Sequence, residues 1–212
     1  MTTDNVTLVM MTCQVDLLVT EARICSVSEL PPWYPGSETK PAPMPLLRVQ
    51  GFINTRDVDD GSDLLEDPVT ARRWLTEAEL LNDTAELTGA QAQLARDVRE
   101  AIRSLIEDDP DSRVGALRDL ATAHRARLCV ADDGTIGLEN ARRDGLGDGL
   151  FELLLIIYRA QQDGSWSRLK VCGNPDCRWA FFDRSRNQQG SWCNMAVCGN
   201  RLKNRELRAR RR

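Results

Sequence analysis

The chain has 212 residues, of which 42% are hydrophobic and 28% are charged, and its formal net charge is −4. These proportions are typical of globular proteins and exclude a collagen-like or wholly disordered chain. No stretch approaches the roughly 18–20 uninterrupted apolar residues that a membrane helix needs, and the N-terminus lacks the pattern of a secretory signal. We therefore expect a cytoplasmic protein with no membrane partner.

The small net charge hides a strong asymmetry along the chain. Residues 168–212 contain twelve of the 28 basic residues but only three of the 32 acidic ones, which gives this end a charge of +9 and the remainder −13. Such asymmetry favours a C-terminal end that binds a polyanion. The alternative is a basic tail that is simply solvated.

The N-terminal 45 residues have no clear secondary structure in the sequence. Residues 1–30 contain a weak apolar alternation that fits either a strand or a short helix. Residues 31–45 hold six of the nine prolines, which predicts a linker or an exposed arm. Trp33 and Tyr34 within it can dock on the body or on a partner, and the sequence does not choose. We treat 1–45 as an N-terminal segment with a proline-rich linker.

Residues 46–163 have mainly helical patterns. An Asp67-Pro68 pair begins one helix, and Thr88 is the predicted N-cap of a longer one that ends before Pro110. An Asp-Asp-Gly turn at 132–134 predicts a hairpin. In the last helix, Leu153 to Ile157 are all apolar, which predicts the central core helix. The expected elements are helices over about 67–81, from Thr88 to before Pro110, over about 112–125 and over about 146–161, with the hairpin at 127–138.

Four cysteines near the C-terminus are arranged as two close pairs. Cys172 and Cys177 are separated by four residues, as are Cys193 and Cys198, and fifteen residues lie between the pairs. Two pairs of thiolates meet the requirement of a tetrahedral zinc site with four sulfur ligands. The spacing therefore predicts one zinc ion per chain, with a structural role because no coordination position is left for substrate or water.

Two alternatives to zinc are a pair of disulfides and four free thiols. Disulfides are disfavoured in a cytosolic chain, and free thiols leave the paired spacing unexplained. The region is also short and poor in aliphatic side chains, and small modules of this kind commonly depend on a metal. Cys129 is expected to be a small core residue, whereas Cys13 and Cys25 have no assigned role beyond a possible redox sensor.

The residues around these cysteines carry a resemblance to a known family. Cys198-Gly199-Asn200-Arg201, together with the Cys172–Cys177 loop and the Trp179–Asp183 segment, resembles the CGNR zinc finger over residues 168–212. Phe52-Ile53-Asn54-Thr55-Arg56, followed by Asp67-Pro68 and Trp74-Leu75, resembles over 46–160 the helical ABATE domain that precedes this finger. That domain is described as a putative stress-induced transcription regulator. The resemblance implies DNA binding.

The segment after the last cysteine predicts a basic helix. It contains good helix formers and no glycine or proline, and arginines at 201, 205, 208 and 212 fall on one face. Arginine suits bidentate contacts to phosphates and guanine edges. Trp179, Phe181, Phe182 and Trp192 can stack on bases, but in so small a module we expect them to form its core. The candidate nucleic-acid-binding residues are Arg184, Arg186, Arg201, Lys203, Arg205, Arg208, Arg210, Arg211 and Arg212.

The fold class is therefore mainly α with a small β-hairpin (α+β). A helical domain at 46–163 is followed at 168–212 by a small zinc-finger module. This module has four cysteine ligands and ends in a basic helix. The favoured function is a zinc-dependent DNA-binding transcription regulator, nucleoid-associated if bacterial, whose helical domain senses a small-molecule effector or forms a homodimer. The acidic part can repel DNA or cover the basic helix. An RNA- or ribosome-associated zinc protein, or an adaptor for an acidic protein partner, are the alternatives.

An enzyme fits the sequence least well. The single histidine, His124, lies in a helical stretch with no nucleophile or acid–base partner nearby. The acidic run from Asp57 to Asp63 resembles a calcium loop in composition, but it lacks the terminal glutamate of that loop. We expect a solvated loop there and a helix-face histidine without a special role.

Overall fold

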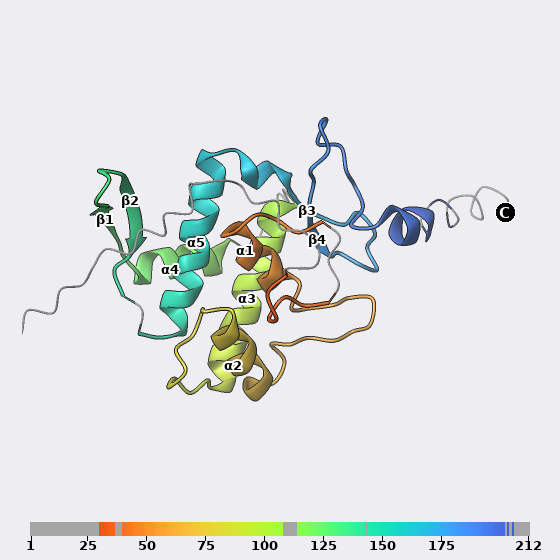
Figure 1. The fold of residues 1–212 in the computed structure, drawn as a ribbon. Helices are drawn as coiled ribbons and strands as arrows, with labels where there is room; N and C mark the ends of the chain where they lie inside the picture. Colours follow the sequence, from red (N-terminus) through yellow and green to blue (C-terminus); the bar gives the residue numbers. More distant parts are fainter. Residues whose placement is uncertain are drawn as a thin grey trace, which may run out of the picture.

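The computed structural model describes residues 30–36, 40–107, 114–142, 144–201, 203 and 205. Its body is a group of helices with a small hairpin at one end and the cysteine-rich part at the other (Figure 1). The apolar alternation of residues 6–10, and Cys13 and Cys25, lie outside the described residues. No described helix is long and apolar enough to cross a lipid bilayer.

Two helices begin at the caps that the sequence predicted. The Asp67 side chain accepts hydrogen bonds from the backbone N–H groups of Val69 and Thr70, and Thr88 forms a capping box with Gln91. The helix after Asp67 is shorter than expected, because Glu79 has a left-handed backbone with φ of 59° and turns the chain after Glu77. The helices are α1 (Leu46–Ile53), α2 (Pro68–Glu77), α3 (Gly89–Ile106), α4 (Gly115–Ala123) and α5 (Leu146–Gln162).

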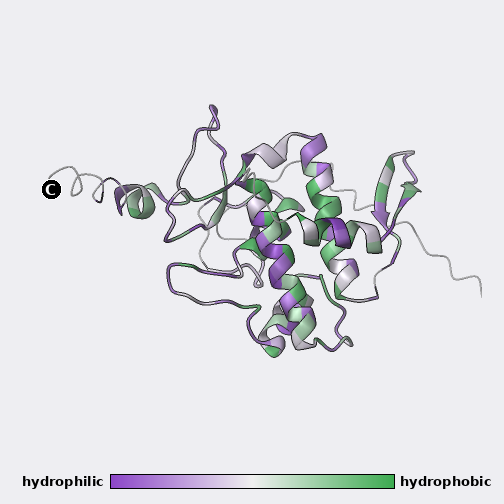
Figure 2. Cartoon of the chain, turned by 180° about the vertical axis from the view of Figure 1, so that it is seen from behind, coloured by the Kyte–Doolittle hydropathy of each residue, from purple (hydrophilic) through white to green (hydrophobic). Residues whose placement is uncertain are grey.

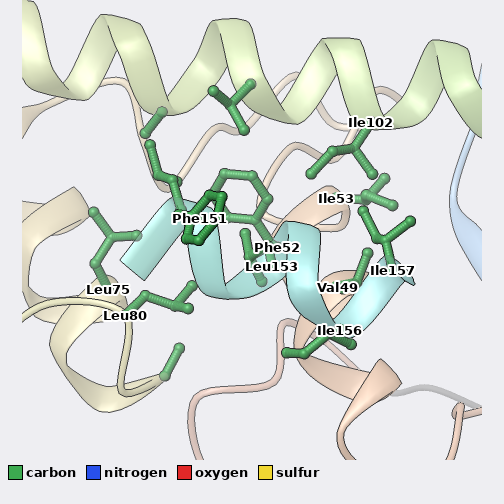
Figure 3. Close-up of a cluster of buried hydrophobic side chains, with 14 of the residues drawn as sticks. Val49, Phe52, Ile53, Leu75, Leu80, Ile102, Phe151, Leu153, Ile156 and Ile157 are labelled. Atoms are coloured by element: carbon green, nitrogen blue, oxygen red, sulfur yellow. The ribbon is translucent and has the colours of Figure 1, made fainter. Parts of the chain in front are cut away.

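Helix α5 lies at the centre of the core, as its apolar run predicted. Leu153 and Ile157 are buried and meet residues of α1 and α3, among them Phe52 and Ile102 (Figure 3). Each such side chain contributes on the order of 1.5–3 kcal/mol when removed from water. The run is not buried all round, because Tyr158 next to it is 46% exposed.

The predicted hairpin is present as β1 (Ala126–Val130) and β2 (Ile136–Asn140), paired antiparallel. Cys129 is buried, in agreement with its expected role as a small core residue. The opposite face of the hairpin exposes Leu128, Val130 and Ile136, and the apolar colour is visible there in Figure 2.

The proline-rich segment is not an exposed arm where the structure describes it. Tyr34 and Ala42 are buried, and Trp33 packs edge-on against Trp74, whose Nε1 donates a hydrogen bond to the Trp33 carbonyl at 2.7 Å. Of the two alternatives for Trp33 and Tyr34, docking on the body is the one observed, because these aromatic side chains find apolar surface on α1 and α2. Gly51 makes room for this, since a Cβ there would lie 2.6 Å from the Trp33 ring.

A second hairpin, which the sequence did not reveal, begins the cysteine-rich part. A short 3-10 turn, η2 (Ser165–Arg168), leads into β3 (Leu169–Val171), which pairs antiparallel with β4 (Ala180–Phe182). Leu169, Ala180 and Phe182 belong to the same buried cluster as the helices. Residues on both sides of position 163 therefore share one core.

Two buried amides, one on α1 and one at its C-cap, hold this hairpin in place. Asn54 Oδ1 accepts from the Ala180 backbone N at 2.7 Å, and Asn54 Nδ2 donates to the Ala180 carbonyl at 2.9 Å. Gln50 Nε2 donates to the same carbonyl at 3.1 Å, while Gln50 Oε1 accepts from the Ala42 backbone N. The amide of Asn54 thus pairs with β4 as a neighbouring strand would.

The acidic loop between α1 and α2 is fixed at its C-terminal end. Arg99 of α3 is 1% exposed and donates two hydrogen bonds to the carboxylate of Asp63, at 2.6 and 2.7 Å. A buried guanidinium needs such a bidentate partner. The rest of the loop, from Asp57 to Ser62, is largely exposed, as predicted.

We predict that Asn54→Leu loosens the C-terminal hairpin from the helices. The change leaves the Ala180 N–H buried without a partner and removes one of two bonds to its carbonyl, so the free energy of unfolding should fall by about 2–4 kcal/mol. Urea unfolding measures this, with Asn187→Leu on an exposed loop as the control. A loss at Asn54 no larger than that of the control would contradict the assigned role.

Candidate metal centre

The four cysteines that the sequence paired converge in the structure. The Sγ atoms of Cys172, Cys177, Cys193 and Cys198 all lie within 4.8 Å of one another. Cys193 Sγ is 3.7 Å from the Sγ of both Cys177 and Cys198, far beyond the roughly 2 Å of a disulfide bond. Among the described residues, no other group of three or more cysteine, histidine or acidic side chains converges in this way.

The first pair is positioned by the β3–β4 hairpin. The Cys172 backbone N donates to the Trp179 carbonyl at 2.9 Å, which extends the ladder by one step beyond Val171. Between the cysteines the chain turns around Asn174, whose carbonyl accepts from the backbone N of both Cys177 and Arg178. Arg178 then takes a left-handed conformation, with φ of 53°, which returns the chain to β4.

The second pair is positioned by a short π-helix, η3 (Met195–Gly199). Its N-cap is Asn194, whose side chain accepts from the backbone N of Ala196 and Val197. The turn brings Cys198 back over Cys193 and buries it, and the next described residues continue as a helix. The Gly173 backbone N bonds to the Ser191 carbonyl at 2.9 Å and so joins the two pairs.

The loop between β4 and Cys193 is organised by Asp183. This carboxylate is 4% exposed and accepts from the Gly190 backbone N at 2.7 Å and from Lys170 Nζ at 3.0 Å. Burial acts to raise the pKa of Asp183, but hydrogen bonds from Ser185, Lys170 and Gly190 outweigh it and hold the pKa well below its usual range. Asp183 therefore closes the loop as a charged, fully bonded group.

Four cysteine sulfurs this close together favour a bound cation. Hydrogen bonding with the Cys172 sulfur raises the pKa of Cys177 to about 12, and hydrogen bonds with Cys172 and Cys177 raise the pKa of Cys193 further. The same bonding, led by Cys177, lowers the pKa of Cys172 to about 2. Four thiolates within 4.8 Å of one another would repel strongly. A divalent cation bound by thiolates relieves this repulsion.

The donor set and its spacing fit zinc. Four sulfurs bound tetrahedrally at about 2.3 Å from zinc lie about 3.8 Å apart, close to the two separations of 3.7 Å. Cys172, Cys177, Cys193 and Cys198 would hold the ion and fill its coordination sphere. When bound, zinc supplies structural stability and no catalytic position.

The predicted nucleic-acid residues fall on two segments. Arg184 and Arg186 lie on the exposed loop after β4, and Arg184 Nη2 donates to the Pro41 carbonyl at 2.7 Å. Arg201, Lys203 and Arg205 are exposed and helical beyond η3. The remaining candidates lie outside the described residues: Arg208, Arg210, Arg211 and Arg212.

The aromatic side chains of this part are mostly core, as expected. Phe181 and Phe182 are buried, and Lys40 Nζ lies 4.7 Å from the Phe181 ring centroid. Trp179 and Trp192 are half-buried, and the Trp192 ring lies against the backbone of Gly173 and Gly199. The ring therefore packs between the two cysteine pairs.

Two ion pairs link the basic helix to the rest of the chain, and the sequence did not predict either partner. Arg201 Nη1 lies 2.8 and 2.9 Å from the two carboxylate oxygens of Asp59, in the acidic loop. Arg205 Nη1 lies 3.3 Å from Asp176 in the first cysteine loop. His124 also has an unforeseen partner: its Nδ1 is 2.9 Å from Asp148, and its ring stacks on Phe151.

Comparison with known families agrees with the resemblance that the motifs carry. Residues 49–160, more than half of the chain, match the ABATE family model, described as "Putative stress-induced transcription regulator". Residues 168–211 match the CGNR zinc finger. A search of curated proteins finds no match.

We predict that each of Cys172→Ser, Cys177→Ser, Cys193→Ser and Cys198→Ser removes the bound zinc, measured as moles of metal per mole of purified chain. The cysteine-rich module should unfold while most of the helical circular dichroism remains, because the helices have their own apolar contacts. Cys129→Ser is the control, since this buried cysteine lies in β1 and should leave the metal content at one. Stoichiometric zinc in all four variants would contradict the assigned ligand set.

Proposed function

The chain belongs to the ABATE family, and from this premise we propose that it is a zinc-dependent transcription regulator whose basic C-terminal helix contacts DNA. The single observation that carries the proposal is the position of that helix. It continues directly from the turn that contains Cys198, a candidate metal ligand, and presents exposed cations at Arg201, Lys203 and Arg205.

A metal at the start of a basic helix would lower the entropy cost of binding DNA. Zinc would fix the direction of the first turn, so that guanidinium groups are offered to DNA without the entropy cost of ordering a free tail. Phosphate contacts supply most of the affinity, and arginines that reach base edges supply specificity. We propose that Arg208, Arg210, Arg211 and Arg212 extend the same contacts, and that Arg184 and Arg186 add phosphate contacts from the β4 loop.

One basic helix makes few base contacts. Dimerisation would allow two helices to read two half-sites, and it is part of the proposal for that reason. The helical domain would then carry the dimer contact or sense an effector. Neither matched family is described as an enzyme.

We propose that the acidic part of the chain competes with DNA for the basic helix. Both carboxylate oxygens of Asp59 lie within hydrogen-bond distance of Arg201 Nη1, so a phosphate would have to displace Asp59 to bind this nitrogen. Both side chains are about half exposed, so solvent and salt screen the pair and DNA can displace it. The loop therefore weakens DNA binding modestly and does not block it.

We predict that Arg201→Ala and Arg205→Ala each weaken binding to duplex DNA while the zinc content stays at one. A lost phosphate contact lowers the salt slope of binding by about 1, whereas a lost base contact relaxes the preference at one position of the site. Fluorescence anisotropy over a salt series, with sites from a random-library selection, measures both. Binding to structured RNA or to an acidic protein in preference to any duplex would overturn the DNA proposal in favour of those partners.

We also predict that Asp59→Asn tightens DNA binding by a few fold, because it frees Arg201 from its carboxylate partner. Asp60→Asn is the matched control: it removes the same charge one residue further along the loop, and Asp60 bonds to Ser62 within the loop. Equal changes for the two variants would indicate only long-range repulsion and would contradict a direct role for the Asp59–Arg201 pair.

A further inference from the structure

The β1–β2 hairpin carries exposed apolar side chains on one of its faces. Leu128 is 73% exposed, Ile136 68% and Val130 62%. Leu128 and Val130 are two residues apart on β1, and Val130 lies directly opposite Ile136 in the register, so the three side chains share one face. Ala126 and Leu138 belong to the same face, and no charged residue of the two strands interrupts it. We call this continuous apolar patch the hairpin face.

The hairpin is attached to the body along one strand, and its apolar face is left open. β1 packs chiefly on β2, and β2 in turn packs on α5, where Arg159 donates a hydrogen bond to the Leu138 carbonyl. Three side chains exposed to this extent present on the order of 300 Å² of apolar surface, a size at which a patch on a monomer is often functional. A two-stranded hairpin is also only marginally stable in water unless its apolar face is covered.

The two ends of the hairpin carry charges of opposite sign. The turn exposes Asp132 and Asp133, and the base, where the strands leave the body, exposes Arg125 and Arg142. Asp144 lies two residues beyond Arg142, toward α5, and leaves the base with a positive balance. Within the described part of the chain, neither arginine side chain forms a salt bridge. These charges are therefore available to a partner.

An acidic turn and a basic base make the hairpin complementary to a second copy of itself. A two-fold axis through the middle of the hairpin face would lay the apolar patch of each copy on that of the other, with the strands antiparallel. The acidic turn of each copy would then lie at the basic base of the other. A parallel arrangement would instead bring like charges together at both ends. The apolar patch and the charge pattern thus select the same partner, another copy of this chain.

We propose that the hairpin face is a homodimer contact, in which Leu128, Val130 and Ile136 pack on the same residues of a second copy. A standard interface buries roughly 800 Å² per partner, and this patch supplies less than half of that, so the dimer should form only at micromolar concentrations.

This contact gives a surface to the dimer of the proposed function. The contact itself does not depend on DNA binding, and only its use on DNA rests on that function. The hairpin and the basic helix lie at opposite ends of the chain (Figure 1). A dimer of this kind would therefore hold its two basic helices far apart, on half-sites separated by several turns of the duplex or on two duplexes.

The test is sedimentation of the full-length, zinc-loaded protein without DNA, over a series of micromolar concentrations. The wild type should pass from monomer to dimer. Leu128→Lys should raise the dimer dissociation constant about tenfold or more, because the two-fold axis places two charges in one apolar contact. Val69→Lys is the matched control, since Val69 on α2 is a single aliphatic side chain that is 78% exposed. Both variants should keep the melting temperature of the wild-type monomer, because neither side chain is buried.

An exchange of charges tests the antiparallel arrangement. Arg125→Asp and Asp132→Arg should each weaken the dimer several fold, because like charges then face each other across the contact. An equimolar mixture of the two variants should recover the wild-type affinity, since each mixed dimer has opposite charges at both ends. Glu77→Arg, an exposed residue of α2, makes the same kind of charge change away from the hairpin. Mixed with Arg125→Asp, it should not restore the dimer.

The proposal is overturned if the wild type stays monomeric throughout the concentration series, or if Leu128→Lys forms the dimer as readily as the wild type. A mixture of Arg125→Asp and Asp132→Arg that fails to recover the dimer would overturn the antiparallel arrangement. A monomer that still binds DNA would remove this contact and leave the proposed function standing. Conversely, a dimer that binds no DNA would retain the contact and remove only its use on DNA.

Discussion

The pairing of one buried amide with one strand residue holds the two parts of this chain together. Asn54 at the end of α1 satisfies both backbone groups of Ala180 in β4, in a place where water cannot replace it. The strand it fixes leads back to Cys172 and Cys177 through the hairpin ladder. The position of the first cysteine pair therefore depends on a residue more than a hundred positions earlier in the sequence.

Because the first cysteine pair depends on α1, the two regions that match family models are not structurally separate. The family models divide the chain near residue 163, but Leu169, Ala180 and Phe182 complete the core that the helices begin. The cysteine-rich part is too small for a core of its own, and zinc would order its loops while the helices supply apolar burial. Metal binding and helix packing are thus expected to stabilise each other.

The opposite charges of the two parts also meet in the structure. The basic helix begins beside the metal centre and touches the acidic loop through an exposed pair, Arg201 with Asp59. The loop is held from its other side by the buried Arg99–Asp63 pair, so it is a fixed element that faces the helix. Helix α1, which holds β4, also borders a cavity in the helical part of the chain.

The sequence by itself determined the features that depend on near neighbours. The caps at Asp67 and Thr88, the turn at 132–134, the apolar run of α5 and the paired cysteine spacing all act over a few residues, and each was predicted correctly. Only the tertiary structure decided that the proline-rich segment docks, that β3 and β4 form a hairpin, and which carboxylates meet Arg201 and His124. These contacts join residues far apart in the chain. Their energies come from burial and from satisfying polar groups in one shared interior, and no local pattern encodes that arrangement.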